Sequence, residues 1–223
     1  MSIFQFYQPL TGVVRHLLIL NVLMFIGSYA LLGNESWNQQ TGEVINLGRL
    51  VLAAYMPGSE HFQPFQIVTH MFMHGDLGHL AFNMLSLYFF GPMVEMAFGS
   101  KRFLFYYLFC GLGAFALHIG VQWWELEAAG FDPRSFNGAM LGASGAIFGI
   151  YVAFAYLYPN QIISLLIPPV SLKAKYFVLI MAGIELFYGF RGHSTGIAHF
   201  AHIGGAVFGF GLLMYWYRYR FRN

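Results

Sequence analysis

The chain has 223 residues, of which 58% are hydrophobic and only 9% are charged. Soluble domains have roughly 45–50% apolar and about 25% charged residues, so this composition excludes both a water-soluble fold and a disordered chain. Eleven basic residues stand against nine acidic ones without a basic cluster that would follow phosphates, so we expect no nucleic-acid partner. A single cysteine, Cys110, excludes an internal disulfide. The composition is that of a membrane protein embedded in a lipid bilayer.

Six apolar runs approach the length needed for a membrane-spanning helix, which is about 20 residues. In chain order they cover about 14–33, 77–97, 102–122, 141–158, 175–190 and 197–217. The first run is not followed by a good small-residue cleavage site, so we interpret it as an anchor and not as a cleaved signal peptide. The sequence predicts an all-α membrane protein with six transmembrane helices in one domain, residues 1–223.

The basic residues predict the orientation of the bundle, because cytoplasmic loops carry an excess of Lys and Arg. Eight of the 11 fall on one side of the six-span arrangement. These are Arg15, Lys101, Arg102, Lys173, Lys175, Arg218, Arg220 and Arg222. We therefore expect a multi-pass protein of the plasma (inner) membrane with both termini in the cytoplasm.

The connection between the first two runs, residues 34–76, is long and mixes apolar with polar side chains. Apolar residues such as Val51 and Phe62 alternate with polar ones such as Gln63 and Gln66. This mixture predicts short amphipathic segments that lie in the outer membrane interface.

Few strongly polar side chains lie within the predicted spans, and such residues are costly in lipid and by default functional. The second run begins with His79 and Asn83, which are one helical turn apart and share a face. Ser144 lies near the start of the fourth run, and His199 and His202 lie near the start of the sixth. These three runs enter from the same side of the membrane, so their polar residues should form one layer.

The depth of this layer follows from helical geometry. Ser144 follows Asn137 by seven residues, and His202 follows Thr195 by seven. At about 1.5 Å per helical residue, both lie about 10 Å below the outer boundary. Two G-x-x-x-G stripes would let the fourth and sixth helices approach closely at this level. They consist of Gly145 with Gly149 and of Gly205 with Gly209.

These residues include the types of catalytic group that acyl transfer requires: a nucleophile, a base and donors to an oxyanion. A serine hydroxyl needs a base to accept its proton, and a neutral imidazole in a partly desolvated site suits that role. The Asn83 amide, the His79 ring and the Ser144 backbone N–H are candidate donors to the oxyanion. No Asp or Glu lies near His202 in the sequence or in the same layer. We therefore expect a Ser144–His202 dyad, with Phe148 stacked on the His202 ring in place of a third group.

Four motifs together resemble the rhomboid family of intramembrane serine proteases, over about residues 65–211. They are His74-x4-His79-x3-Asn83, Gly91-x3-Glu95-x3-Gly99-Ser100, Gly142-Ala143-Ser144-Gly145, and Ala201-His202-Ile203-Gly204-Gly205 with Gly209 beyond. The resemblance implies that Ser144 is the nucleophile, His202 the general base, and Asn83 and His79 the oxyanion donors. It also implies that residues 34–76 form a membrane-embedded first loop and that the fifth helix belongs to a lateral gate. The implied substrates are single-span membrane proteins, and we expect no cofactor and no metal.

Two other functions stay open at this point. The first is a histidine-rich membrane metalloprotein, although the chain has no H-E-x-x-H motif and no carboxylate beside the histidines. Its candidate ligands are His70, His74, His79, His199 and His202. The second is a catalytically silent rhomboid-like protein that only binds membrane proteins; such forms typically lose the Ser or the His.

Three histidines have alternative interpretations. His199 precedes His202 by three residues, faces nearly the same side and is the main rival for the role of base. The Gly-Gly pair that follows His202 after Ile203 favours His202 as the base. His70 and His74 are expected to donate hydrogen bonds within the first loop.

Overall fold

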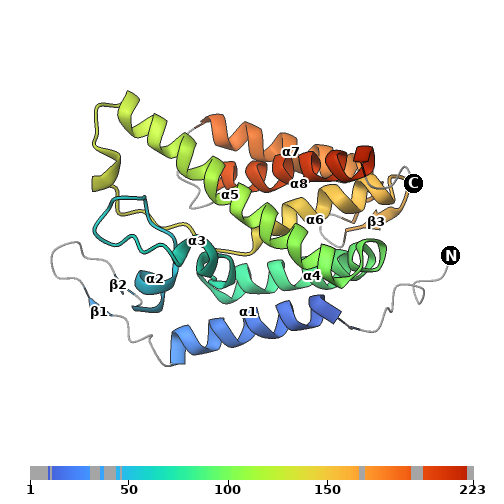
Figure 1. Cartoon of the computed structure of the whole chain (residues 1–223), viewed down its shortest axis with the longest axis horizontal. Coiled ribbons are helices and arrows are strands. Elements are labelled where there is room, and N and C mark those ends of the chain that lie inside the picture. Colours follow the sequence, from blue (N-terminus) through green and yellow to red (C-terminus); the bar gives the residue numbers. More distant parts are fainter. Residues whose placement is uncertain are drawn as a thin grey trace.

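The computed structural model of the chain describes residues 10, 12–30, 36–37, 44–45, 47–165, 169–191 and 198–219. Helices dominate this part of the chain (Figure 1). The long ones are α1 (Gly12–Ala30), α4 (Leu77–Phe98), α5 (Ser100–Ala128), α6 (Ser144–Leu157), α7 (Ala174–Arg191) and α8 (His199–Tyr219). The short elements are α2 (Leu47–Leu52), α3 (Gln66–Thr69), η2 (His70–Phe72), η3 (Pro133–Ser135), and the antiparallel pairs β1 (Ser36–Trp37) with β2 (Val44–Ile45) and β3 (Ile162–Ser164) with β4 (Ser171–Lys173).

Four of the described helices are long and apolar enough to cross a membrane, namely α1, α4, α5 and α8 up to Arg218. Four of the six predicted runs thus contain a helix that is long and apolar enough to span a membrane. Helix α6 has 14 residues and is shorter. Helix α7 has 18 residues and includes the charged Lys175, Glu185 and Arg191. The predicted span residues 31–33 and 197 lie outside the described residues.

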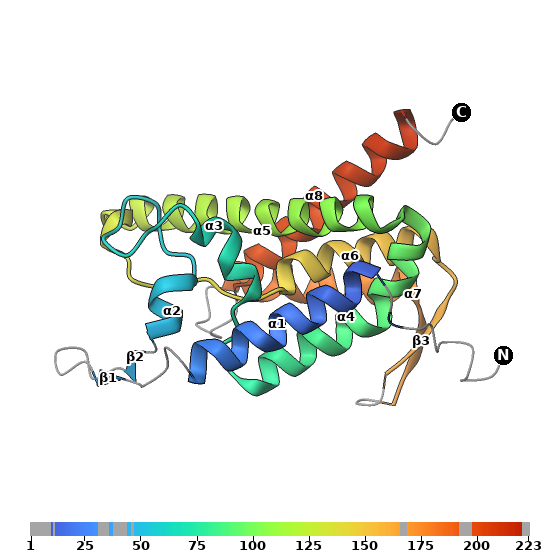
Figure 2. The same ribbon diagram turned by 60° about the horizontal axis from the view of Figure 1, so that its bottom comes forward.

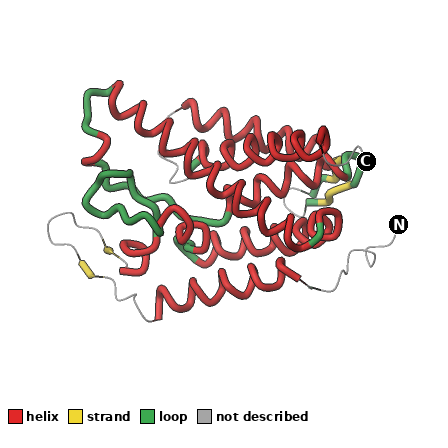
Figure 3. Tube along the Cα trace, viewed as in Figure 1, coloured by secondary structure: helices red, strands yellow, loops and turns green. Residues whose placement is uncertain are grey.

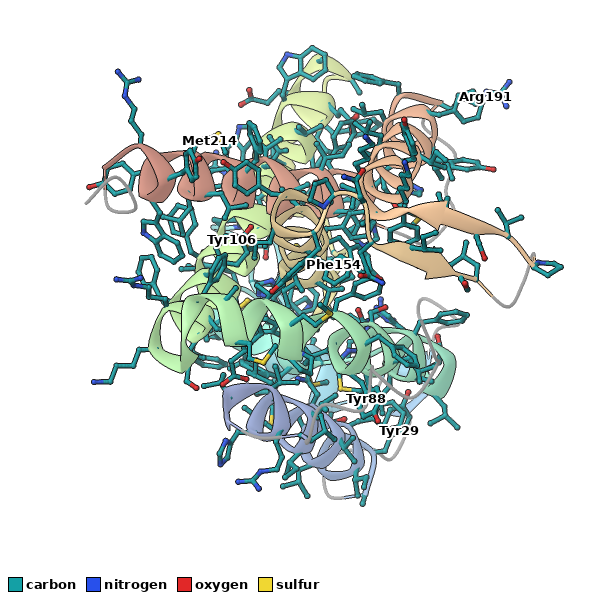
Figure 4. The ribbon with its side chains drawn as sticks, turned by 90° about the vertical axis from the view of Figure 1, so that its right-hand side faces the viewer. Tyr29, Tyr88, Tyr106, Phe154, Arg191 and Met214 are labelled. Atoms are coloured by element: carbon teal, nitrogen blue, oxygen red, sulfur yellow. The ribbon has the colours of Figure 1, made fainter. Side chains whose placement is uncertain are left out.

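Helix α6 forms the centre of the bundle. All its residues from Gly145 to Tyr151 are buried, as expected for a helix that is apolar all round and packed on every side. Helices α4, α5, α7 and α8 surround it, and α1 covers α4 at the edge of the bundle (Figures 1 and 2). Tyr106 of α5 and Phe154 of α6 are buried in this interior (Figure 4).

Loops and short elements gather at the two ends of the bundle (Figure 3). One end carries the short helices α2, α3 and η2 and the segment 129–143, and the other carries the β3–β4 hairpin. Within the predicted first loop, the side chain of Gln66 is fully buried and donates to the carbonyl groups of Val51 (3.1 Å) and His61 (3.0 Å). Residues 34, 35, 38–43 and 46 of this connection lie outside the described part.

The structure corrects the predicted entry into α6. The helix begins at Ser144 and not at 141, because Met140 pairs with Ala54 in an antiparallel bridge and Gly142 has a φ of +124°. Residues 137–143 are therefore not helical, so a helical rise of about 1.5 Å per residue does not apply between Asn137 and Ser144. The matching starting point for His202, Thr195, lies outside the described residues.

Candidate active site

Ser144 and His202 meet where α6 and α8 begin. Ser144 is the first residue of α6, and His202 lies one turn into α8. The distance between Ser144 Oγ and His202 Nε2 is 2.7 Å, within the range in which an imidazole accepts a proton from a serine hydroxyl. The His202 side chain is 12% exposed, so the pair is shielded from bulk water but not sealed.

The close approach of α6 and α8 depends on glycines. A Cβ atom on Gly205 would overlap the carbonyl oxygen of Gly145, and a Cβ on Gly145 would overlap the side chain of Ala114 in α5. One turn further along, a Cβ on Gly209 would lie 3.1 Å from the Cα of Gly149. The two G-x-x-x-G stripes thus face each other, as small residues do where membrane helices pack backbone to backbone.

Tyr106 of α5 contacts α6 near the same junction, at Gly149. Its hydroxyl donates to the carbonyl oxygen of Gly149 over 2.9 Å, and its side chain is fully buried. Figure 4 shows Tyr106 directed into the interior of the bundle. A hydrogen bond is strengthened in a low-dielectric interior, and this one fixes α5 against α6.

Phe148 lies against the imidazole of His202. The two ring centroids are 4.4 Å apart, and the ring planes differ by only 6°. Phe148 is one turn beyond Ser144 on α6, so the helix that carries the hydroxyl also limits rotation of the His202 ring.

The expectation that no carboxylate lies near His202 is wrong. Glu185 of α7 places Oε1 3.0 Å from His202 Nδ1 and Oε2 2.6 Å from His199 Nδ1. Glu185 is 17 positions before His202, and only the packing of α7 on α8 brings them together. A glutamate in the middle of an apolar run is itself a signal of function, and it was the signal that could have found this contact.

His199, the rival for the role of base, is held away from the hydroxyl. Its Nδ1 bonds to Glu185, and its ring stacks on Tyr188 with a centroid distance of 5.7 Å. The hydrogen bond of Ser144 is made with His202.

The candidate oxyanion donors border Gly142. A Cβ atom at this glycine would lie 2.8 Å from His79 Nε2 and 3.6 Å from Ser144 Oγ. The backbone N–H of Gly75 donates to His79 Nδ1 over 3.5 Å, which leaves the ring proton on Nε2, on the side of Gly142. The first N–H groups of α6, beginning at Ser144, have no acceptor within their own helix.

Asn83 is buried and lies one helical turn after His79 on α4. One hydrogen of its amide is donated to the carbonyl oxygen of His79 over 3.0 Å. Because a side-chain amide carries two hydrogens, this bond leaves a second donor.

His70 ties the first loop to the start of α6. Its Nδ1 bonds to the carbonyl oxygen of Gln66 over 2.9 Å, and its own carbonyl oxygen accepts from Gly142 N at 2.9 Å. Burial lowers the pKa of His70 to about 4, so the ring is neutral at physiological pH. The expected role in loop hydrogen bonding is confirmed for His70.

His74 does not meet that expectation. It is 2% exposed, and neither ring nitrogen has a hydrogen-bond partner within the described residues. Its ring packs edge-on against His79 at 5.1 Å between centroids. Burial, with the neighbouring His79, lowers the pKa of His74 to about 4. His74 therefore contributes a neutral ring that supports His79.

The five histidines do not define a metal centre. Among the described residues, no group of three or more His, Cys, Asp or Glu side chains is arranged to hold a metal ion. The metalloprotein alternative thus finds no ligand set in this part of the chain.

Fold and site together define a class: a helical membrane protein in which a buried serine and histidine meet between two closely packed helices. The model of the Rhomboid domain family matches residues 61–220, and the chain belongs to the rhomboid family. It is an integral membrane protein.

Three relatives illustrate the likeness. The chain is 32% identical to rhomboid protease AarA of Providencia stuartii over 146 residues, which cover 62% of this chain and 51% of AarA. It is 33% identical to rhomboid protease GluP of Bacillus subtilis, over 66% of this chain and 25% of GluP. It is 31% identical to the mitochondrial rhomboid protein 1 of Saccharomyces cerevisiae, over 68% of this chain and 41% of that protein. The match thus spans about half or less of each relative.

Proposed function

We propose that this protein is an intramembrane serine endopeptidase that cleaves transmembrane segments of membrane proteins, with Ser144 as nucleophile and His202 as general base. The observation that carries the proposal is the 2.7 Å contact between Ser144 Oγ and His202 Nε2 inside an apolar bundle. A serine and an imidazole in hydrogen-bond contact form the pair required for acyl transfer. Membership of the rhomboid family, with relatives named proteases, supports the same function.

In the proposed reaction, Ser144 Oγ attacks the carbonyl carbon of the substrate while its proton passes to His202 Nε2. Asn83, His79 and the first N–H groups of α6 donate to the oxyanion. Collapse of the intermediate breaks the C–N bond, and His202 returns the proton to the leaving amine. A water molecule then gives a proton to His202 and attacks the acyl ester, which releases the acid and restores the Ser144 hydroxyl.

The proposed topology has six spans in one domain, with α6 and α7 crossing the membrane beside the four longer helices. Helix α6 is short, but it is surrounded by other helices and does not need to match the bilayer thickness. The segment containing α2, α3 and η2 is the proposed membrane-embedded first loop. The distribution of basic residues supports cytoplasmic termini and a plasma (inner) membrane location.

The proposed substrates are single-span membrane proteins. A peptide bond inside a helix is shielded by its neighbours, so the substrate helix must unwind before Ser144 can reach a carbonyl carbon. Helix-breaking or small residues near the cleaved bond lower the cost of unwinding, since glycine disfavours a helix by about 1 kcal/mol and proline by about 3. We therefore expect cleavage near such residues.

The decisive experiment is cleavage of a model single-span substrate by the purified full chain in detergent and in liposomes. Ser144→Ala and His202→Ala should each abolish cleavage. Ser28→Ala and His16→Ala, both in α1, are matched controls. Ser28 donates to the carbonyl of Phe25 and His16 bonds to that of Gly12, both within α1 and away from the Ser144–His202 pair; both variants should cleave normally. A folded wild-type protein that neither cleaves nor reacts with a fluorophosphonate probe would instead be a silent binding protein.

A further inference from the structure

Glu185 holds two histidines of the neighbouring helix with one carboxylate. Its Oε1 lies 3.0 Å from His202 Nδ1, and its Oε2 lies 2.6 Å from His199 Nδ1. Glu185 and His199 are each 7% exposed. A buried carboxylate in an apolar bundle is costly unless it is paired, and here both oxygens have an imidazole partner.

This contact favours one position for the ring proton of His202. An ionised carboxylate cannot donate a hydrogen bond, so its negative charge beside Nδ1 favours the tautomer with the hydrogen on Nδ1. In a neutral imidazole the other nitrogen, Nε2, then has the lone pair. Nε2 is the atom that faces the Ser144 hydroxyl, so Glu185 selects the tautomer that can accept its proton.

The contact has room to strengthen during the reaction. Although the distance is 3.0 Å, the His202 Nδ1 atom is not aligned well enough with Glu185 to form a hydrogen bond. Catalytic hydrogen bonds are often poorly aligned in the resting enzyme and improve as charge develops. When His202 takes the proton of Ser144, the ring becomes positively charged and its attraction to the carboxylate rises.

His199 keeps the carboxylate in position. Its ring is fixed between Glu185 and Tyr188, on which it stacks with a 20° angle between the ring planes. The ionisable groups around this cluster are Tyr188 of α7 and, through their interaction with His202, His79 of α4 and His118 of α5. None of these three groups is a carboxylate, so the negative charge beside the imidazole comes from Glu185.

We propose that Glu185 is a positioning residue that holds His202 through Nδ1 and stabilises its charged form, with His199 anchoring the carboxylate. The proposal rests on the proposed protease function. It extends the Ser144–His202 pair to a series of contacting side chains, from Ser144 on α6 through His202 on α8 to Glu185 on α7. It makes the placement of α7 against α8 a condition for full activity.

The test measures kcat and KM for cleavage of a single-span substrate from pH 5 to pH 9, using the full-length protein. Glu185→Gln keeps the shape of the side chain and removes its charge. We expect kcat to fall by about 100-fold with KM little changed. The acid limb of the pH profile should move to lower pH, because an imidazole without its carboxylate binds a proton less tightly. Glu127→Gln changes an exposed glutamate in α5, so it should neither lower kcat nor move the acid limb.

Two further variants separate positioning from folding. Glu185→Asp retains the charge and should recover part of kcat and the wild-type acid limb. His199→Gln should lower kcat less than Glu185→Gln and leave the acid limb in place. An NMR titration of the His202 ring, which needs no activity, should show the same displacement to lower pH in Glu185→Gln.

The outcomes are distinct. Wild-type kcat and an unmoved pH profile in a folded Glu185→Gln would overturn the positioning role and leave the protease proposal intact. The positioning role would also be overturned if Glu185→Gln and Glu185→Asp lost the same factor in kcat, if both losses followed a lowered melting temperature, and if the His202 titration did not shift. Absence of cleavage by the wild type would refute the protease, whereas a displaced His202 titration would still support the Glu185 contact.

Discussion

Gly205 of α8 lies so close to Gly145 of α6 that a Cβ atom on Gly205 would overlap the Gly145 carbonyl oxygen. This contact lies one residue beyond Ser144 on one helix and three beyond His202 on the other. The separation of the helices, and with it the distance between hydroxyl and imidazole, is therefore set by the absence of side chains at these two positions.

We expect Gly205→Ala to reduce cleavage strongly. The added methyl group must push α8 from α6, and a displacement of about 1 Å at a reacting pair costs on the order of 100-fold in rate. The control is Gly211→Ala on the same helix, where a Cβ would meet nothing within 4 Å. Both variants should be assayed for kcat and for melting temperature. Normal kcat in Gly205→Ala would show that the added methyl group does not move α8 away from α6.

Phe148 offers a separate test of ring orientation. Replacing Phe148 by Leu keeps an apolar side chain but removes the flat surface that lies 4.4 Å from the His202 ring centroid. Aromatic stacking contributes about 0.5–1.5 kcal/mol beyond its buried area, so we expect kcat to fall by about 10-fold. Phe210→Leu, at a half-exposed position on α8, is the matched control. A Phe148→Leu enzyme as active as this control would argue against stacking as the means of orientation.

The membrane helices and the pair of Ser144 and His202 could be anticipated from the sequence for one physical reason. A bilayer excludes polar groups, so apolar runs identify helices and the rare polar residues within them mark chemistry. Gly145 and Gly205 signalled close packing because small residues serve that purpose in lipid. The catalytic roles themselves remain predictions.

Two features of the structure could not be predicted from the sequence, because they depend on contacts between segments that are distant in the chain. The start of α6 at Ser144 depends on pairing between Met140 and Ala54, and no local pattern shows such a bridge. The approach of Glu185 to His202 depends on how α7 rotates against α8. Hydropathy indicates that a helix exists but not which neighbour a given side chain faces, so the sequence does not predict that Glu185 faces His202.

Glu95 provides a prediction about stability. Its carboxylate oxygens accept from the backbone N–H groups of Val13 (2.8 Å) and Val14 (2.9 Å) at the start of α1, and from the Ser100 hydroxyl (2.5 Å). A carboxylate at a helix N-terminus satisfies unpaired donors and complements the helix dipole. Glu95→Gln keeps the shape but loses the charge, and we expect a loss of about 1–3 kcal/mol in the free energy of unfolding.

The measurement for Glu95→Gln is thermal unfolding in detergent, together with limited proteolysis of α1. The exposed Glu127→Gln is the control. We expect earlier release of α1 in Glu95→Gln and no change in Glu127→Gln. Equal melting temperatures for the two variants would mean that the charge of Glu95 is not needed to hold α1.

Buried neutral histidines in the first loop predict destabilisation by acid. Burial lowers the pKa of His70 from 6.5 to about 4. Between these two values the unfolded chain binds a proton that the folded protein does not, so stability falls as the pH drops from about 6.5 to about 4 and changes little further below. At about 1.36 kcal/mol per pH unit, the His70 contribution amounts to at most about 3.4 kcal/mol.

The experiment compares the melting temperature of the wild type and of His70→Asn at pH 7.5 and at pH 4.5. Asparagine can still donate to the Gln66 carbonyl but does not titrate, so the variant should lose less stability on acidification than the wild type. His16→Asn, at an exposed position of α1, should behave as the wild type does. The same acid-induced loss in all three proteins would indicate that His70 takes up its proton without disturbing the loop, and that its hydrogen bond to Gln66 does not depend on a neutral ring.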